Sequence, residues 1–399
     1  MDRTGHSLTQ QFILVVSMMV LAGSLGTETG AVLLSIGVDL DIGYDALGVL
    51  VSSRFVGGMV GPIALLVWPP RRHVIPVYLV ATSLVIISMI PLLFARDLPT
   101  LLVVGLMRGA AAGLIIPASN YTVRTWFSHR AGRYASLVNA AFGLGMVMMP
   151  LAAQRFVRDP SLWRWAWSIS ALIAAGSVCY MVVLMLRRSD RATPSTPATA
   201  EQARSSADAA PKPKALDYVL VQLLVVFIVA AEATVVGWMP SLVGLGTGFD
   251  AAPLALAISL AILCGRLLSG YASDRVGVAH YHRASVLLLV AAFLVPPGAL
   301  AWLGGYAHAT WAGLAMSGIY PTMIALIVQR FAASDRRTYM GIGISGGIGG
   351  ALAGTLVGVL AEQQPAFAAA LVGPPAALLA LTIGVVMQRR SATQRAATR

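Results

Sequence analysis

The sequence predicts an all-α membrane protein with 12 transmembrane helices in two pseudo-symmetric six-helix bundles. Three observations predict it: the composition is too apolar for a soluble domain, the apolar residues cluster into runs of membrane-spanning length, and the second half of the chain repeats residues of the first. Of the 399 residues, 57% are hydrophobic and 11% are charged, whereas a soluble domain carries about 25% charged residues. Such a chain cannot cover itself with a polar surface.

Each apolar run is about 20 residues long, the length that a helix rising about 1.5 Å per residue needs to cross a hydrocarbon core about 30 Å thick. The runs must be helices, because no water is present there to satisfy backbone N–H and C=O groups. The expected spans are 12–35, 44–67, 73–94, 98–121, 134–156, 163–185, 218–243, 251–272, 284–303, 306–328, 339–360 and 366–387.

The basic residues indicate how the chain is oriented. The formal net charge is +12, which in a soluble protein would suggest a nucleic-acid partner. Here most of the 28 Lys and Arg fall in the termini and the even-numbered loops, and only Arg96, Arg155, Arg158 and Arg164 fall in the odd-numbered loops or at the span ends beside them. The positive-inside rule therefore predicts a multi-pass protein of the cell (inner) membrane with both termini cytoplasmic. The expected partner is the lipid bilayer, and no nucleic acid.

A polar segment divides the chain into two halves. Residues 187–217 are rich in Ala, Pro, Ser and charge, which predicts a disordered cytoplasmic linker between a half at 1–186 and a half at 218–399. Cys179 and Cys264 both lie within spans and predict no disulfide or metal framework. The sequence has no P-loop, metal-ligand cluster or activated nucleophile. We therefore expect no enzyme, no cofactor, no metal and no ATP-driven transport.

The two halves are related by an internal duplication. An offset of 204 residues pairs Glu28 with Glu232, Pro117 with Pro321, Phe127 with Phe331, Arg133 with Arg337, Gly143 with Gly347 and Gly145 with Gly349. Within the second and eighth spans the offset is 212, and it pairs Arg54 with Arg266, Gly58 with Gly270 and Arg71 with Arg283. Because six spans are an even number, the copies share one orientation and are related by an axis along the membrane normal.

One loop of the second half carries a family signature. The stretch from Gly270 to Gly277, with Asp274 and Arg275 inside it, resembles the G-x-x-x-D-R-x-G signature of the major facilitator superfamily. Residues 232–242, 317–322 and 117–120 with 142–145 resemble the fucose permease-like sugar and proton symporters. The resemblance implies a transporter that works by alternating access, with its solute bound near the midplane between the halves. Its partners would then be a small-molecule substrate and protons.

The sequence departs from these families at several positions. The first half has Pro62 and Ile63 in place of the Asp-Arg pair, and the symporters' fourth-span acid falls on Ile116. Residues 142–150 match only part of the drug–proton antiporter signature. The resemblance therefore implies proton-coupled uptake of a sugar or an organic anion, and proton-coupled efflux of drugs or metabolites remains the alternative.

Five charged residues lie well inside the expected spans, away from the span ends: Glu28, Arg54, Arg108, Glu232 and Arg266. A charge at the bilayer centre costs about 2.5 to 3.5 kcal/mol on insertion scales, so each should face a cavity or a partner. Glu28 and its repeat mate Glu232 are candidate proton-coupling residues, because a carboxylate whose surroundings change during alternating access can load and release a proton. A fixed ion pair and a solvated site are the alternatives for Glu28.

The three arginines are candidate substrate-binding residues. Arg108 lies about 15 Å into its span, before a run of Gly and Ala that leaves room around a guanidinium. It resembles the fourth-span Arg of proton-coupled superfamily members, and a buried Arg bonded to neighbouring carbonyls is the alternative. Arg54 and Arg266 would make the site net positive and favour an organic anion. Alternatively, Arg266 pairs with Asp274 or with helix carbonyls at the inner gate.

The remaining candidates are two amides, a tryptophan, a loop and a row of glycines. Asn120 and Asn139 lie within spans and could bind solute, and Trp238 could stack on substrate or belong to the membrane interface. The predicted gating loop comprises Gly270, Asp274, Arg275 and Gly277. Close helix packing is expected at four glycines that share one face of the eleventh span: Gly346, Gly350, Gly354 and Gly358.

Overall fold

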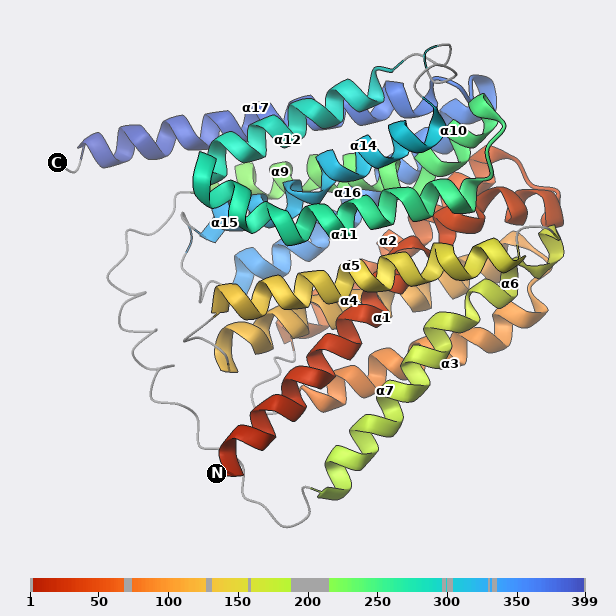
Figure 1. Cartoon of the computed structure of the whole chain (residues 1–399), viewed down its shortest axis with the longest axis horizontal. Coiled ribbons are helices and arrows are strands. Elements are labelled where there is room, and N and C mark those ends of the chain that lie inside the picture. The colour runs from red at the N-terminus through yellow and green to blue at the C-terminus, as the bar shows by residue number, and fades with distance from the viewer. Residues whose placement is uncertain are drawn as a thin grey trace.

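The computed structural model describes residues 3–67, 74–126, 131–156, 159–187, 215–295, 299, 304–328, 331 and 336–397. Over these residues the chain is helical and forms no strand (Figure 1). Eleven of the described helical segments are long and apolar enough to cross a membrane. A further apolar helix, α12 (Val278–Phe293), has 16 residues and occupies the place of the expected ninth span. The predicted all-helical membrane class is confirmed.

The two halves have the same order of spans. The first half contains α1 (Arg3–Leu40), α2 (Tyr44–Val67), α3 (Ile75–Phe94), α4 (Leu98–Trp126), α5 (Ala131–Phe156), the short η2 (Pro160–Leu162), α6 (Trp163–Ala166) and α7 (Ser168–Arg187). The second half contains α9 (Ala215–Ala233), η3 (Thr234–Trp238), α10 (Met239–Thr247), α11 (Ala251–Val276), α12, α14 (Gly305–Ser317), α15 (Ile319–Val328), α16 (Arg336–Gln363) and α17 (Ala368–Ala397). Most of the predicted linker, 188–214, lies outside the described residues.

Three of the expected spans are interrupted helices. The seventh passes from α9 through the π-helical segment η3 into α10, where Pro240 has no N–H to continue the helical hydrogen-bond ladder. The tenth is divided at Gly318 into α14 and α15, and the sixth is divided at Trp167 into α6 and α7. The hydropathy of these segments is continuous, so the sequence predicts single helices there.

Short polar contacts fix several of the turns. The side chain of Asp97 accepts a hydrogen bond from the backbone N–H of Thr100 at 2.8 Å, and Asp159 accepts one from Ser161 at 3.0 Å. Hydrogen bonds from the side chain and backbone of these partners lower the pKa of both aspartates below the ordinary range. At Gly277 a φ of 85° lets α11 end and α12 begin without an intervening loop.

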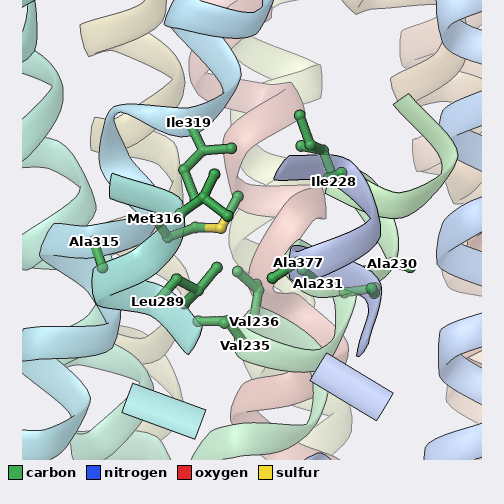
Figure 2. Packing of buried hydrophobic residues seen from close by; sticks show 14 of the residues in the cluster. Ile228, Ala230, Ala231, Val235, Val236, Leu289, Ala315, Met316, Ile319 and Ala377 are labelled. Atoms are coloured by element: carbon green, nitrogen blue, oxygen red, sulfur yellow. The ribbon is translucent and has the colours of Figure 1, made fainter. Parts of the chain in front are cut away.

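Among the described residues, the buried apolar cluster that the two halves share most evenly lies at one end of the molecule. We call the end with the 187–215 connection the linker end and the opposite end the loop end. Near the loop end, residues of the first half such as Val32 and Leu47 are buried in one cluster with Trp238 and Val357 of the second. Each of the other two buried apolar clusters belongs almost wholly to one half. Figure 2 shows part of the cluster in the second half. In Figure 1 the ribbons of the two halves accordingly diverge toward the linker end.

The interface between the halves, here called the seam, is closest between α2 and α16. A side chain at Gly358 would clash with the backbone at Gly48. Beside it, the Ser52 hydroxyl donates to the carbonyl of Ala351 at 2.6 Å and lies 2.9 Å from the Thr355 hydroxyl. Of the four glycines predicted to share a packing face, three contact α2 and one contacts α9: Gly350, Gly354 and Gly358, and then Gly346.

The duplication is visible in how matched glycines pack. A side chain at Gly145 of α5 would clash with the Val20 carbonyl of α1, and one at Gly349 of α16 would clash with the Val226 carbonyl of α9. Each half therefore holds its fifth span against its first span through the same glycine. These two matched glycines thus have matched structural roles.

Candidate functional site

Glu28 and Arg108 form a buried ion pair inside the first half. Arg108 of α4 donates from Nε to Glu28 Oε1 at 2.7 Å and from Nη2 to Oε2 at 2.8 Å. The exposed fraction is 0% for Arg108 and 1% for Glu28. This two-point contact fixes both side chains, because the planar guanidinium matches the two carboxylate oxygens.

The rest of the polar atoms around this pair are also bonded. Arg108 donates to the Ser88 hydroxyl at 3.0 Å, to the Trp167 carbonyl at 3.2 Å and to the Ser170 hydroxyl, and it lies 5.1 Å from the Trp167 ring. The Trp167 indole in turn donates to the Glu28 carbonyl at 3.1 Å. The break between α6 and α7 at Trp167 places that ring and carbonyl against the pair. The network involves only elements of the first half, and its satisfied bonds favour the fixed ion pair among the alternatives for Glu28.

Arg54 lies on α2 near the seam. Its Nη1 donates to the Leu25 carbonyl of α1 at 2.8 Å and also to the Gly26 carbonyl. The guanidinium lies 4.8 Å from the ring of Phe55. Arg54 is thus held by neutral groups, and its positive charge attracts both Glu28 and Glu232 through space.

Arg266 lies on α11 and reaches across the seam. Its guanidinium is 5.0 Å from the ring of Phe142 on α5, which belongs to the first half. Its Nε is buried and has no hydrogen-bond partner within the described part of the chain. Electrostatic attraction links Arg266 to Glu232 and Tyr320. Arg266 therefore presents a buried donor that lacks an acceptor among the described residues.

Glu232 completes a charged group that spans both halves. It is partly buried on α9 and is attracted by Arg266 and then by Arg54, but no ion pair within 4.0 Å joins these three side chains as described. We call Arg54, Glu232, Arg266, Phe142 and Tyr320 the seam cluster. Its two positive charges and one negative charge leave it net positive.

Comparison with known proteins identifies the architecture. The family model described as Major Facilitator Superfamily matches residues 12–314. The chain belongs to this superfamily. It is therefore a multi-pass membrane transporter and not an enzyme, as the sequence predicts. A search of curated proteins finds no match to the sequence.

Three solved structures of transporters share the fold of this superfamily member. The xylose transporter XylE from E. coli, in a partially occluded inward open conformation, has a TM-score of 0.73 at 12% identity, covering 96% of this chain and 97% of XylE. A D-xylose-proton symporter has a TM-score of 0.68 at 16% identity, covering 95% and 97%. A mutant of the nucleoside transporter NupG has a TM-score of 0.68 at 13% identity, covering 96% and 99%.

The other predicted substrate-binding residues of this transporter are two asparagines and Trp238. Asn120 on α4 and Asn139 on α5 are partly exposed. Trp238 is 0% exposed in the core that both halves share near the loop end, and its Nε1 has no partner within the described regions. This position gives Trp238 a packing role in the present conformation.

The predicted gating loop lies at the linker end of α11. Gly270, Asp274 and Arg275 are exposed, and the Arg275 guanidinium lies 4.3 Å from the Tyr271 ring. A surface hollow of about 560 Å³ lies beside this loop, bounded by α11 and α12. The gating role of this segment stays a prediction.

The sequence did not single out several residues that matter to the two charged sites. Ser88, Trp167 and Ser170 bind Arg108, and Phe142 stacks on Arg266. Serines and tryptophans are common in membrane spans, so their identity alone gives no signal. Phe142 is a member of the 142–145 motif, and its place beside the glycine that faces α11 was the available signal.

Proposed function

We propose that this transporter binds a small organic anion at the seam cluster and carries it across the membrane by alternating access, coupled to protons through Glu232. The observation that carries the proposal is the buried Nε of Arg266, which has no acceptor among the described residues and lies where the two halves meet. Solute sites of parallel-repeat transporters lie at that interface.

A carboxylate fits the chemistry of Arg266. Burying an arginine donor without an acceptor is costly, and a bound anion would supply both the acceptor and the opposite charge. The Phe142 ring holds the plane of the guanidinium from one side by a cation–π contact. The N–H edge of the same group suits the two oxygens of a carboxylate. Arg54 adds a second positive charge from the other half.

Glu232 is better placed than Glu28 to couple protons to such an anion. The carboxylate of Glu232 attracts the same arginines that would hold the solute. Protonating Glu232 removes this competing negative charge, so proton binding and anion binding favour each other. The charged groups that act on Glu232 are Arg266 and Arg54, and Tyr320 acts on Arg266. The charge of Glu28 is already neutralised by Arg108.

The two ends of the interface between the halves differ in this conformation. The halves share a core at the loop end and diverge toward the linker end (Figure 1). With both termini cytoplasmic, as the positive-inside rule predicts, the end at which the halves diverge would face the cytoplasm. The similar XylE structure is of an inward open conformation. Solute would then enter at the loop end when that core separates, and leave at the linker end.

A proton-coupled sugar uptake is the second candidate. Residues 232–242 and 317–322 resemble the fucose permease-like symporters, and two of the structural neighbours are named for xylose. A sugar is neutral and needs many hydrogen-bonding groups, whereas the seam cluster offers mainly charge and aromatic rings. The two candidates therefore differ in how strongly they depend on Arg266.

Flux into proteoliposomes with an imposed pH gradient separates these possibilities. The panel pairs each carboxylate with its neutral amide, such as benzoate with benzamide, and adds D-xylose. We expect carboxylate flux that rises with the inward proton gradient, is lost in Arg266→Gln, is weakened in Arg266→Lys, and loses its gradient dependence in Glu232→Gln. The control is Arg155→Gln, which removes an exposed charge of α5 at the loop end.

Two results would contradict the proposal. Equal flux of carboxylate and amide in the unchanged protein would rule out a site selective for anions. Carboxylate flux that survives Arg266→Gln would show that Arg266 does not bind the carboxylate. Xylose flux that is indifferent to Arg266→Gln would instead favour the sugar candidate. If solute accumulates in the proteoliposomes only when the proton gradient is directed outward, proton-coupled efflux would be favoured instead.

A further inference from the structure

A second group of charged side chains lies at the linker end of the second half, away from the seam cluster. Arg283 of α12 donates from Nη2 to Gln388 Oε1 of α17. Arg390, also of α17, has its Nε 3.6 Å from Oδ1 of Asp217 at the start of α9. We call Asp217, Arg283, Gln388 and Arg390 the donor cluster. It joins three helices at the surface of one half.

This cluster has more donors than acceptors. Arg283 Nε, Gln388 Nε2 and Arg390 Nε are buried, and none has a hydrogen-bond partner within the described residues. The cluster contains two arginines and one carboxylate, which Arg390 faces while Arg283 contacts Gln388, so the cluster is net positive. Leaving buried donors unsatisfied is unfavourable, and the favourable remedy is an acceptor that is itself an anion.

The cluster is open to an external group on one side. The side chain of Arg390 is 34% exposed, whereas that of Asp217 is 3% exposed. The neighbouring Arg389 is exposed as well and adds positive charge at the same helix end. An anion arriving from outside would therefore meet arginine before it meets the carboxylate.

Exposed apolar side chains begin where the donor cluster ends. Leu287 lies one turn beyond Arg283 on α12 and is 52% exposed, and Val386 lies one turn before Arg390 on α17 and is 41% exposed. Residues four apart share a helix face, so both leucine and valine lie on the faces that carry the arginines. Helices α12 and α17 pack against each other (Figure 1). Charged groups are thus followed, toward the middle of the membrane, by an apolar surface.

We infer that the donor cluster binds the phosphate of an anionic phospholipid, whose acyl chains lie along α12 and α17. The guanidinium groups of Arg283 and Arg390 match phosphate oxygens, and Gln388 adds a neutral donor. A zwitterionic headgroup carries an ammonium that the same arginines repel, so a net-negative headgroup binds more tightly. The site is independent of the transported solute and of the proposed function.

Lipid-dependent stability of the purified full-length protein tests this inference. Apparent melting is measured in detergent with phosphatidylglycerol or phosphatidylcholine at equal mole fraction, and bound lipid is counted by native mass spectrometry. We expect phosphatidylglycerol to raise the melting temperature more than phosphatidylcholine. In the double variant Arg283→Gln with Arg390→Gln this difference disappears, and phosphatidylglycerol binds about tenfold more weakly.

The matched control removes the same two charges at the opposite end. Arg96 and Arg155 are exposed at the loop end, so Arg96→Gln with Arg155→Gln should keep the full preference for phosphatidylglycerol. Gln388→Leu keeps both charges and should weaken binding partially, which gives a readout if the double variant does not fold. The inference is overturned if the two lipids stabilise equally, if the double variant or Gln388→Leu keeps the full preference, or if inorganic phosphate reproduces the shift.

Discussion

Replacing Glu28 by Gln should destabilise the protein by about 3–5 kcal/mol, the cost of removing one partner from a buried ion pair. Arg108 donates to the two carboxylate oxygens at 2.7 and 2.8 Å, and with Gln it would keep one acceptor at most and lose the opposite charge while its side chain stays 0% exposed. Its other acceptors, the Ser88 and Ser170 hydroxyls and the Trp167 carbonyl, are neutral. They cannot compensate a full charge.

Removing both charges should cost much less. Isosteric hydrophobic replacement of a buried pair is often neutral or stabilising by about 1–4 kcal/mol. In Glu28→Met with Arg108→Met the serines and the Trp167 carbonyl would lose hydrogen bonds worth about 1 kcal/mol each, which offsets that gain. The double variant should therefore lie within about 2 kcal/mol of the unchanged protein.

Unfolding titrations in mixed detergent micelles measure these free energies, and the double-mutant cycle gives the coupling between the two residues. A loss below about 1 kcal/mol for Glu28→Gln, or a double variant as unstable as the sum of the single ones, would refute the reasoning. Flux adds an independent readout. A folded double variant that keeps proton-driven flux supports the structural role, whereas one that loses only its proton dependence would return the coupling role to Glu28.

Three further predictions concern the seam and the loops. Glu362 of α16 accepts a hydrogen bond from the backbone N–H of Tyr44 of α2 at 2.8 Å, and its negative charge thus lies at the N-terminus of α2. Glu362→Gln should therefore shift the equilibrium toward loop-end opening by about 1 kcal/mol, or about fivefold. Longer distances between spin labels at that end would show this shift. Gly354→Leu should clash with Ser52 and block loop-end closure, which abolishes flux while leaving helix content unchanged by circular dichroism. The pKa of Asp159 is lower in the folded protein than its ordinary value. The stability that this carboxylate contributes is therefore present above the ordinary pKa and is lost as pH falls through the folded pKa. Melting scans between pH 3 and 6 should show less acid destabilisation for Asp159→Asn than for the unchanged protein.

Hydropathy and repetition predicted the helices because both are properties of the chain read along its length. The loop and span pattern, the matched residues at 28 and 232, and the glycines of the eleventh span all depend on spacing alone. The glycine row of α16 did prove to be a packing face, with three of its members against α2. Such features need no knowledge of which helices are neighbours.

Pairing between helices was harder to predict. The depth of Glu28 along its span places it in the membrane, but depth does not show which way the side chain points. Successive residues are about 100° apart around a helix, so a small rotation of the helix decides whether a side chain faces a cavity or the interior of its own bundle. Glu28 and Arg108 are 80 residues apart in the chain, and nothing in the sequence links them. The stacking of Arg266 on Phe142 joins different halves, so it depends on the conformation as well as on the fold.

The buried Ala312 of α14 occupies the position that Arg108 has in the first half. A protein assembled from two first halves would hold both glutamates in buried ion pairs with arginine. Neither glutamate would then be free to gain or lose a proton during transport. With alanine at 312, the second copy keeps an acid that can change its charge. Under the proposed mechanism, the duplication thus gave one half an anchor and the other a responsive element, and a single small residue separates the two roles.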